Sequence, residues 1–338
     1  MVVMYQSREY IRNLTAQTLP SMRYDGKEPY EVWKSAAREK LAELLGLPLS
    51  SCEDAPEILS EKNCGGYRQI DFHFQSERDY FVPCTLLIPD GTPKPLAICL
   101  QGHSTGMHIS CGEEKFPGDG DLIRGGRDFA LQALGAGYSA LILEQRYMGG
   151  CGNLHGAPLC SRRNAALPSL LLGRTAIGER VWDVQRAIDM IEKYFSDDVN
   201  TKNILCMGNS GGGTVSFYAS CMDDRIKVSM PSCSVCEFED SIVPFYHCCC
   251  NYIPGIRKYF EMGDLACLMA DRALIIVCGV KDPDFPLAGV VKSYERARAG
   301  FGAIGREKYC VLIKGSEGHR FYPEEAWPAA KELTAISF

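Results

Sequence analysis

The stretch "ILCMGNSGGGTVSFY", residues 204–218, joins two apolar segments through four glycines and a single serine. The apolar run before Gly208 predicts a buried strand, and the apolar residues after the glycines predict a helix that begins near Thr214. Gly208, Ser210 and Gly212 have the spacing GxSxG between these two elements. A sharp strand-to-helix turn strains its central residue and needs neighbours without side chains. The turn is therefore predicted to present the Ser210 hydroxyl above the sheet, at a helix N-terminus that stabilises negative charge.

A phosphate-binding loop or a tight packing turn would also use several glycines. No lysine follows these glycines as in a P-loop, and the spacing GxGxxG is absent. A packing turn stays open at this point, because GxSxG alone often occurs by chance. The rest of the chain has to supply the partners that a reactive serine needs.

An activated serine needs a base within hydrogen-bond reach and a carboxylate that orients the base. Of the six histidines, His319 lies in a loop directly after the last predicted strand, downstream of the serine. The stretch "ALIIVCGVKDPDFP" ends a buried strand and supplies Asp282, our choice, and Asp284, the alternative. The predicted catalytic residues are Ser210, Asp282 and His319, in that chain order. An ordinary surface-loop histidine is the competing explanation of His319.

Short, nearly continuous apolar runs recur on both sides of the serine, as expected for parallel strands buried on both faces. The runs are "LAICLQG", "SALILEQ", "NILCMG", "RIKVSM", "ALIIVCG" and "YCVLIKG". Helical patterns separate several of them; in "GERVWDVQRAIDMIEKYF" the residues Val181, Val184, Ile188 and Ile191 line one face. The sequence therefore predicts an α/β fold with a mostly parallel central sheet flanked by helices. "YRQIDFHF" and "DYFVPCTLLIPDG" predict a leading antiparallel pair.

The N-terminal part is expected to be a helical extension, residues 1–65, ahead of a catalytic domain at 66–338. Its main helix is predicted over Tyr30–Leu45, with apolar residues at helical spacing at Val32, Ala36, Leu41, Leu44 and Leu45. A lid insertion is expected around 231–262, after the run "RIKVSM".

From about residue 67 to the C-terminus the chain resembles the α/β-hydrolases, and within them the dienelactone hydrolase-like and acetyl xylan esterase-like serine hydrolases. The residues that carry the resemblance are "LQGHSTG", "GERVWDVQRAIDMI", "GNSGGG", "GVKDPDFP" and "EGHRF". Where relatives often have His-Gly-His, this chain has Gln101, Gly102 and His103. An oxyanion hole is predicted from the backbone amides of Gly211 and His103, with Ser104 as the neighbouring alternative.

Composition excludes several classes of partner. The formal charge is −6 and no run of lysines or arginines occurs, so nucleic acid and anionic membrane are not expected partners. No window is apolar enough for a membrane span, and the first residues lack a secretory signal, so a cytoplasmic location is expected. Seventeen cysteines, several inside apolar runs, indicate buried reduced thiols. No cofactor and no metal are expected.

Three further groups of polar residues stand out, and two of them have more than one explanation. Cys233, Cys236, His247 and Cys248 supply four soft ligands, but their spacing is not that of a zinc finger, so thiols lining a lid are preferred. Glu144 and Arg146 are an ion pair or two solvated charges. Asp183 and Arg186, three apart, are expected to form a surface pair.

The predicted function is a serine esterase that hydrolyses small carboxylic esters, with acetyl esters of carbohydrates implied by the resemblance. A prolyl-oligopeptidase type of peptidase is the alternative in the same fold, but about 65 leading residues leave no room for a propeller. A lipase is disfavoured because no long exposed apolar lid stands out. A non-catalytic binding protein of the same fold is the alternative from another class. The sequence does not indicate an oligomeric state.

Overall fold

A central sheet organises the chain. Within residues 6–52, 55–152 and 166–336, which the computed structural model describes, nine strands form one sheet in the order β1-β2-β3-β5-β4-β6-β7-β8-β9. The strands are β1 (Glu57–Asn63), β2 (Tyr67–Glu77), β3 (Tyr80–Pro89), β4 (Lys94–Leu100), β5 (Ser139–Leu143), β6 (Val199–Asn209), β7 (Ile226–Ser232), β8 (Ala273–Gly279) and β9 (Cys310–Gly315). From β5 to β9 all neighbours are parallel, whereas β1, β2 and β3 pair antiparallel. The six predicted apolar strands and the leading antiparallel pair are confirmed.

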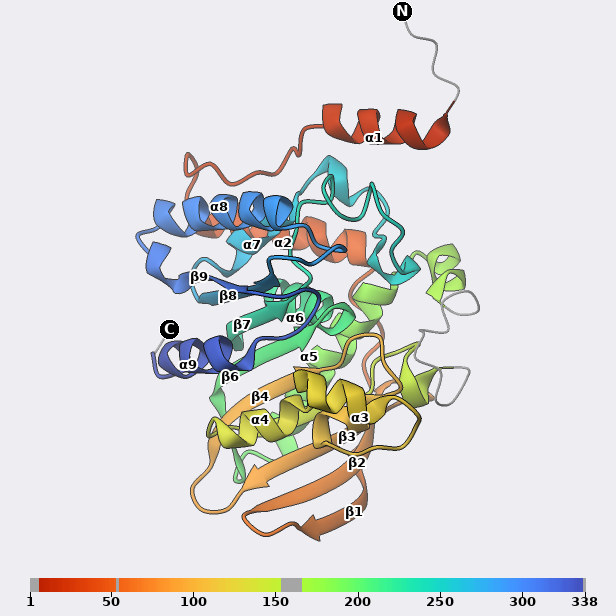
Figure 1. Ribbon diagram of the computed structural model, residues 1–338, viewed down its shortest axis with the longest axis vertical. Coiled ribbons are helices and arrows are strands. Elements are labelled where there is room, and N and C mark those ends of the chain that lie inside the picture. Colours follow the sequence, from red (N-terminus) through yellow and green to blue (C-terminus); the bar gives the residue numbers. More distant parts are fainter. Residues whose placement is uncertain (1–5, 53–54, 153–165, 337–338) are drawn as a thin grey trace, which may run out of the picture.

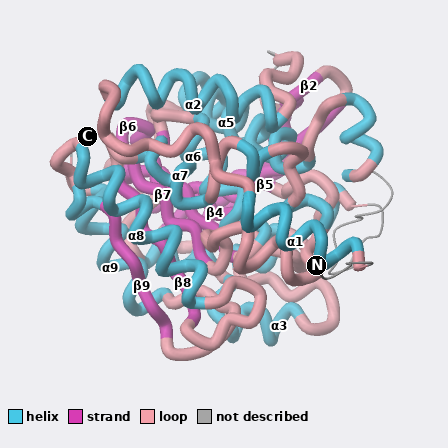
Figure 2. Tube along the Cα trace, turned by 90° about the horizontal axis from the view of Figure 1, so that it is seen from above, coloured by secondary structure: helices cyan, strands magenta, loops and turns pink. Residues whose placement is uncertain are grey.

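Helices cover both faces of the sheet (Figures 1 and 2). They are α1 (Ser7–Gln17), α2 (Tyr30–Leu45), α3 (Asp119–Leu122), α4 (Phe129–Gly135), α5 (Ala176–Tyr194), α6 (Gly211–Met222), α7 (Met262–Ala266), α8 (Leu287–Ala303) and α9 (Pro323–Thr334). Side chains alternate along each strand, so Ile98 belongs to the buried cluster that includes residues of α2, α5, α6, α7 and α8. The next residue, Cys99, belongs to the cluster that includes residues of α4 and α9. Burial on both faces explains why these strands read as continuous apolar runs.

The sheet begins earlier than the sequence indicated. β1 pairs with β2 through the register Glu57↔His73 to Asn63↔Arg68, so the expected boundary at residue 65 falls inside the sheet. The sequence "EILSEKN" gave no signal because β1 is an edge strand with almost every residue exposed.

The N-terminal helices differ in how they attach. α2 spans the predicted residues, but the predicted face is partly wrong: Val32 and Ala36 are exposed, whereas Trp33 and Ala37 are buried together with Leu41. The reason is that α2 packs on the molecule through its aromatic residues, which a count of aliphatic positions overlooks. α1 buries none of its residues.

The expected Asp183–Arg186 surface pair is wrong. Val181, Val184, Ile188 and Ile191 are buried as predicted, but Asp183 is buried as well and receives two hydrogen bonds of 2.7 Å from Arg146. Arg186 pairs with Asp189 instead, at 2.6 Å. The buried pair fixes the loop after β5 to helix α5, and burying both charges is tolerated because they satisfy each other.

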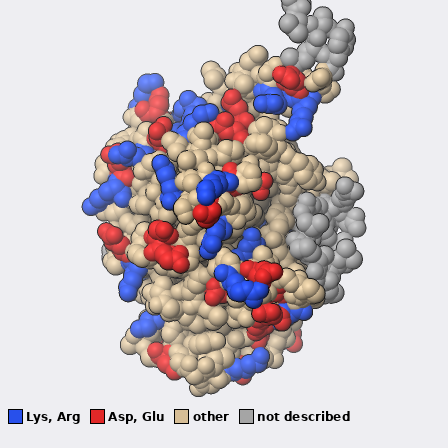
Figure 3. Space-filling model, in the orientation of Figure 1, with Lys and Arg blue, Asp and Glu red and all other residues tan. Residues whose placement is uncertain are grey.

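Charged side chains lie at the surface, and several cysteines lie in the core. On the face shown in Figure 3, acidic and basic side chains are interspersed. Cys99, Cys206 and Cys278 are buried, as expected from their apolar runs. None of the described helices is both long and apolar enough to span a bilayer.

Candidate active site

Ser210 occupies the turn between β6 and α6, in a conformation that residues with side chains rarely adopt. Its φ is 56° and its ψ −122°. The flanking glycines are required by close backbone contacts: a Cβ on Gly208 would lie 2.5 Å from the Gly212 carbonyl oxygen, and one on Gly212 would lie 2.1 Å from that of Leu100. The amide of Thr214 donates to the Ser210 carbonyl at 2.8 Å, which starts the helix directly at the turn. The strained turn and its glycines thus have one cause, the tight approach of α6 to the ends of β4 and β6.

Two later loops bring a histidine and a carboxylate together. His319 Nδ1 lies 2.8 Å from Asp282 Oδ2. The loops after β8 and β9 that carry them are tied by the amide of Lys281, which donates to the Glu317 carbonyl at 2.9 Å. They approach so closely that a Cβ on Gly279 would lie 2.0 Å from the Gly318 carbonyl oxygen.

The Asp282 carboxylate is held in its ionised form. Burial alone would raise its pKa, but the hydrogen bond and charge of His319, with the amides of Asp284 and Phe285 at 2.9 and 3.2 Å, outweigh burial and lower the pKa below its ordinary value. Asp284, the alternative acid, supplies its backbone amide to this network, and its side chain is exposed.

Ser210 and His319 share a cavity of about 290 Å³. Its other lining residues are His103, Arg127, Gly211, Thr214, Tyr246, His247, Cys248, Asn251, Asp284 and Phe285. The ring of Phe285 stacks on that of His319, with centroids 5.8 Å apart. The cavity is therefore lined by both the predicted serine and the predicted base. Asp282 does not line it and contacts His319 instead.

The loop after β4 runs beside the serine. A Cβ on Gly102 would lie 2.6 Å from the Asn209 carbonyl oxygen and 3.1 Å from Ser210 Cβ, so a glycine is needed for this approach. The next residue, His103, reaches the start of α6, where its ring lies 3.1 Å from a Cβ built on Gly211. The two amides predicted to form an oxyanion hole thus belong to backbone segments that lie close to Ser210.

Glu144 links the loops of this region through backbone hydrogen bonds. It does not form the ion pair with Arg146 that was one of the two explanations from the sequence. Glu144 accepts hydrogen bonds from the amides of Met107 at 3.2 Å and Gly150 at 3.1 Å, which links the loops after β4 and β5. Arg146 pairs with Asp183 and Glu77 instead. Burial raises the pKa of Glu144 to about 7, although both amides oppose this shift.

Several residues of the cavity had no signal in the sequence. Arg127 lies between β4 and β5, far from any motif, and its Nη1 donates to the His103 carbonyl oxygen at 3.4 Å. Burial lowers the pKa of Arg127 and that of His247. Asn251 comes from the segment 231–262, which therefore forms one wall of the cavity.

The four soft ligands singled out in the sequence do not gather in one place. Cys236 Sγ contacts the Pro286 carbonyl oxygen at 3.7 Å, and His247 Nε2 lies 3.2 Å from Ser241 Oγ. Cys233 groups with Asp282 and His319, and Cys248 groups with His103 and Cys250. No metal-binding group among the described residues contains two of the predicted four.

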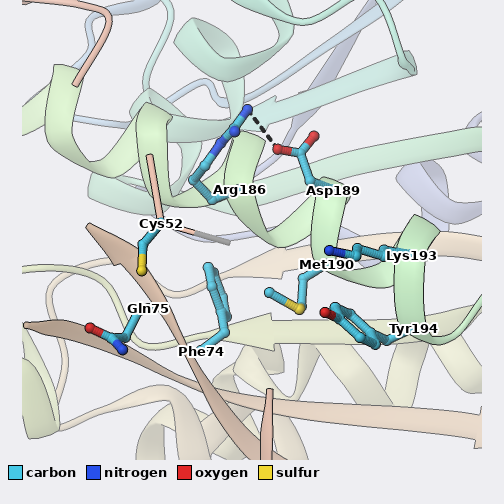
Figure 4. A pocket seen from close by; sticks show the side chains of 8 residues that line it. All are labelled: Cys52, Phe74, Gln75, Arg186, Asp189, Met190, Lys193 and Tyr194. Carbon is cyan, nitrogen blue, oxygen red and sulfur yellow. Dashed lines mark ion pairs between the residues drawn. The ribbon is translucent and has the colours of Figure 1, made fainter. Parts of the chain in front are cut away.

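A second cavity, of about 250 Å³, lies between β2 and α5 (Figure 4). The pair Arg186 and Asp189 lies on one side, and Phe74 and Met190 give it an apolar floor. No serine or histidine lines it, so it does not contain the predicted serine and histidine. The cavity at Ser210 is the candidate active site.

Comparison with known proteins places the fold. No family model matches the chain. The Bacillus subtilis (strain 168) protein named "Putative hydrolase YtaP" is 25% identical over 244 residues, 70% of this chain and 77% of that protein. A "putative acetyl xylan esterase" of Bacteroides fragilis NCTC 9343 superposes with a TM-score of 0.76 at 18% identity, covering 92% of this chain and 83% of that one. A glucuronoyl esterase from Solibacter usitatus gives 0.67 at 16% identity, covering 94% and 98%. The chain has the α/β-hydrolase fold, as the sequence predicted.

Proposed function

We propose that the protein is a serine esterase that hydrolyses small carboxylic esters of carbohydrates. The observation that carries the proposal is the pairing of His319 with Asp282 at 2.8 Å beside the cavity that contains the strained Ser210. Nucleophile, base and carboxylate come from three turns at the carboxyl ends of β6, β8 and β9, where ligands bind in open α/β sheets.

In the proposed reaction Ser210 Oγ attacks the ester carbonyl carbon while His319 Nε2 takes the hydroxyl proton. The Asp282 carboxylate holds the other ring nitrogen in its protonated form and stabilises the imidazolium. The ester C–O bond then breaks, the alcohol leaves with the proton from His319, and an acyl-serine remains. Water, deprotonated by His319, hydrolyses the acyl-serine to the free acid.

The amides of Gly211 and His103 are the proposed donors to the tetrahedral oxyanion. Gly102 supports this assignment, because only a residue without a side chain lets that loop approach Ser210 so closely. Two backbone amides aimed at the developing charge are worth about 10²–10³ in rate for each donor, as found for other oxyanion holes.

Acetyl esters of sugars are the finer proposal. It is supported by similarity to proteins described as acetyl xylan and glucuronoyl esterases and by the small size of the cavity, about 290 Å³. The segment 231–262 is proposed to form the lid wall of this cavity, supported by the positions of Tyr246 and Asn251. A cytoplasmic location is proposed from the burial of so many thiols, and a small-molecule ester as the partner.

The test is hydrolysis of p-nitrophenyl acetate combined with covalent labelling by a fluorophosphonate. The wild type should release p-nitrophenol and gain one adduct on Ser210, whereas Ser210→Ala should lose both. Absence of turnover and of an adduct would favour the non-catalytic alternative. A panel of acetylated xylo-oligosaccharides, methyl glucuronate esters and prolyl peptides then separates the substrate classes. Cleavage of the peptides alone would contradict an esterase.

A further inference from the structure

A cluster of three metal-binding side chains lies next to the candidate active site and takes no part in the proposed reaction. Its members are His103, Cys248 and Cys250, whose ligand atoms all lie within 4.8 Å of one another. Cys250 Sγ is 3.7 Å from His103 Nε2. Both cysteines are buried and the histidine is half-buried.

We propose that these three side chains bind one soft divalent cation, for which Zn²⁺ is the best match. Zinc binds thiolate sulfur at about 2.3 Å and imidazole nitrogen at about 2.0 Å in tetrahedral geometry, so sulfur and nitrogen ligands lie about 3.5 Å apart. The observed 3.7 Å between Cys250 Sγ and His103 Nε2 is close to this value, and the three ligand atoms all lie within 4.8 Å of one another. Two thiolates and one imidazole are a soft donor set that selects zinc over magnesium or calcium.

Local backbone structure explains how the two thiols converge. Cys248 is the N-cap of the short 3-10 turn Cys249–Asn251, so residues 248 and 250 project from one tight turn while Cys249 is not in the group. His103 comes from the loop after β4, almost 150 residues earlier. A cation here would therefore join the segment 231–262 to the loop that carries a proposed oxyanion amide.

Within the described residues no fourth histidine, cysteine or carboxylate belongs to the group. Three protein ligands leave one coordination position for water or another small ligand, as in exchangeable zinc sites. His103 and Cys248 also line the cavity of Ser210, so the ion would lie at its wall. On binding, each thiol releases one proton to solvent, and the two thiolates neutralise the charge of the ion.

The experiment uses the full chain, reduced and stripped with a chelator, titrated anaerobically with Co²⁺ as a spectroscopic probe. We expect one equivalent to produce the thiolate-to-cobalt absorption and the strong visible bands of tetrahedral Co²⁺, and Zn²⁺ to bleach both. Cys250→Ser and Cys248→Ser should each weaken binding by about 100-fold or more. Cys249→Ser, in the same turn but outside the group, should bind like the wild type.

A variant that misfolds would also lose the metal. X-ray absorption on the cobalt-loaded wild type avoids this problem, and it should report two sulfur ligands and one imidazole on cobalt. Absence of the thiolate band in reduced protein would overturn the proposal. Binding that survives Cys250→Ser but is lost in Cys233→Ser would also overturn it, because the ion would then lie with Asp282 and His319. Neither readout uses ester hydrolysis, so this proposal and the proposed function fail separately.

Discussion

Asp282 and Asp284 show how two similar carboxylates two residues apart acquire different roles. Asp282 is buried, accepts two backbone amides and faces the His319 ring, whereas Asp284 contributes one of those amides and keeps its side chain exposed. The difference arises from the turn after β8, which directs the first aspartate inward.

Replacing Asp282 should therefore cost far more activity than replacing Asp284. Asp282→Asn is expected to lower kcat by about 10⁴, because an amide cannot hold the imidazole in the reactive tautomer. Asp284→Asn, the matched control, should lower kcat by less than about tenfold. Steady-state hydrolysis of p-nitrophenyl acetate measures both, and a larger loss in the Asp284 variant would assign the acid to Asp284.

Glu144 should make the stability of the fold depend on pH. Its pKa is about 7 when folded and 4.5 in an exposed chain, so the folded state binds the proton more tightly. The stability gained from this proton is complete below pH 4.5 and is lost as the pH rises through 7, a change of about 3 kcal/mol. Glu144→Gln keeps an acceptor for the two amides but cannot ionise.

The free energy of urea unfolding measures this difference between pH 4.5 and 8. As the pH rises from 4.5 to 8, the free energy of unfolding of Glu144→Gln should increase by about 3 kcal/mol relative to that of the wild type. Glu325→Gln, on the exposed face of α9, is the control and should show no such trend. A constant difference for Glu144→Gln would mean that the pKa of this carboxyl is the same in the folded and unfolded states.

At the scale of elements, the turn between β6 and α6 should tolerate no side chain at Gly212. A Cβ there would lie 2.1 Å from the carbonyl oxygen of Leu100, the last residue of β4, and 2.6 Å from that of Gln101, and both are backbone atoms rather than the ends of flexible side chains. Gly212→Ala is expected to destabilise the protein by about 3 kcal/mol or more. The control is Gly135→Ala at the end of α4, where nothing lies within 4 Å.

Thermal unfolding followed by circular dichroism compares the two variants. Gly135→Ala should be neutral or slightly stabilising, because alanine restricts the unfolded chain. Equal melting temperatures would show that β4 and α6 approach less closely than described.

Elements with a strong local pattern were predictable, and those that depend on distant contacts were not. The parallel strands and the turn at Ser210 were readable because apolar runs and glycines reflect local constraints. The edge strand β1 was not, because its residues are exposed and its pairing with β2 is not encoded locally. Arg127 lines the cavity from the end of the helical turn Ile123–Arg127, just before α4, and no motif marks this position. The pairing of Arg146 with Asp183 rather than with Glu144 was not predictable for the same reason, because tertiary packing determines the partners.

For the whole molecule, the two N-terminal helices should differ in their contribution to stability. α1 buries no side chain and touches the body through contacts such as that of Arg8 with the Pro244 carbonyl oxygen. Trp33 of α2 is only 2% exposed, and its indole nitrogen donates to the Met22 carbonyl oxygen at 3.1 Å. In the N-terminal extension, α1 is therefore attached at the surface, whereas α2 is part of the hydrophobic core.

Deleting residues 1–17 should change the melting temperature by no more than about 2 °C and leave ester hydrolysis intact. Trp33→Ala should cost about 3–5 kcal/mol, since it removes a large buried ring. Differential scanning calorimetry of the two proteins makes the comparison. A large loss on deletion would mean that α1 packs more firmly than its exposed residues indicate.

The many buried thiols have a consequence for the lifetime of the protein. Burial keeps the pKa values of Cys84 and Cys99 well above the ordinary value, so these groups stay protonated and unreactive in the native state. Unfolding would expose the buried thiols to water at once, with the acidity of ordinary thiols. In air, an unfolded chain can then oxidise into mispaired disulfides before it refolds. The survival of the protein is therefore governed by how rarely it unfolds, and a reducing environment determines whether unfolding is reversible.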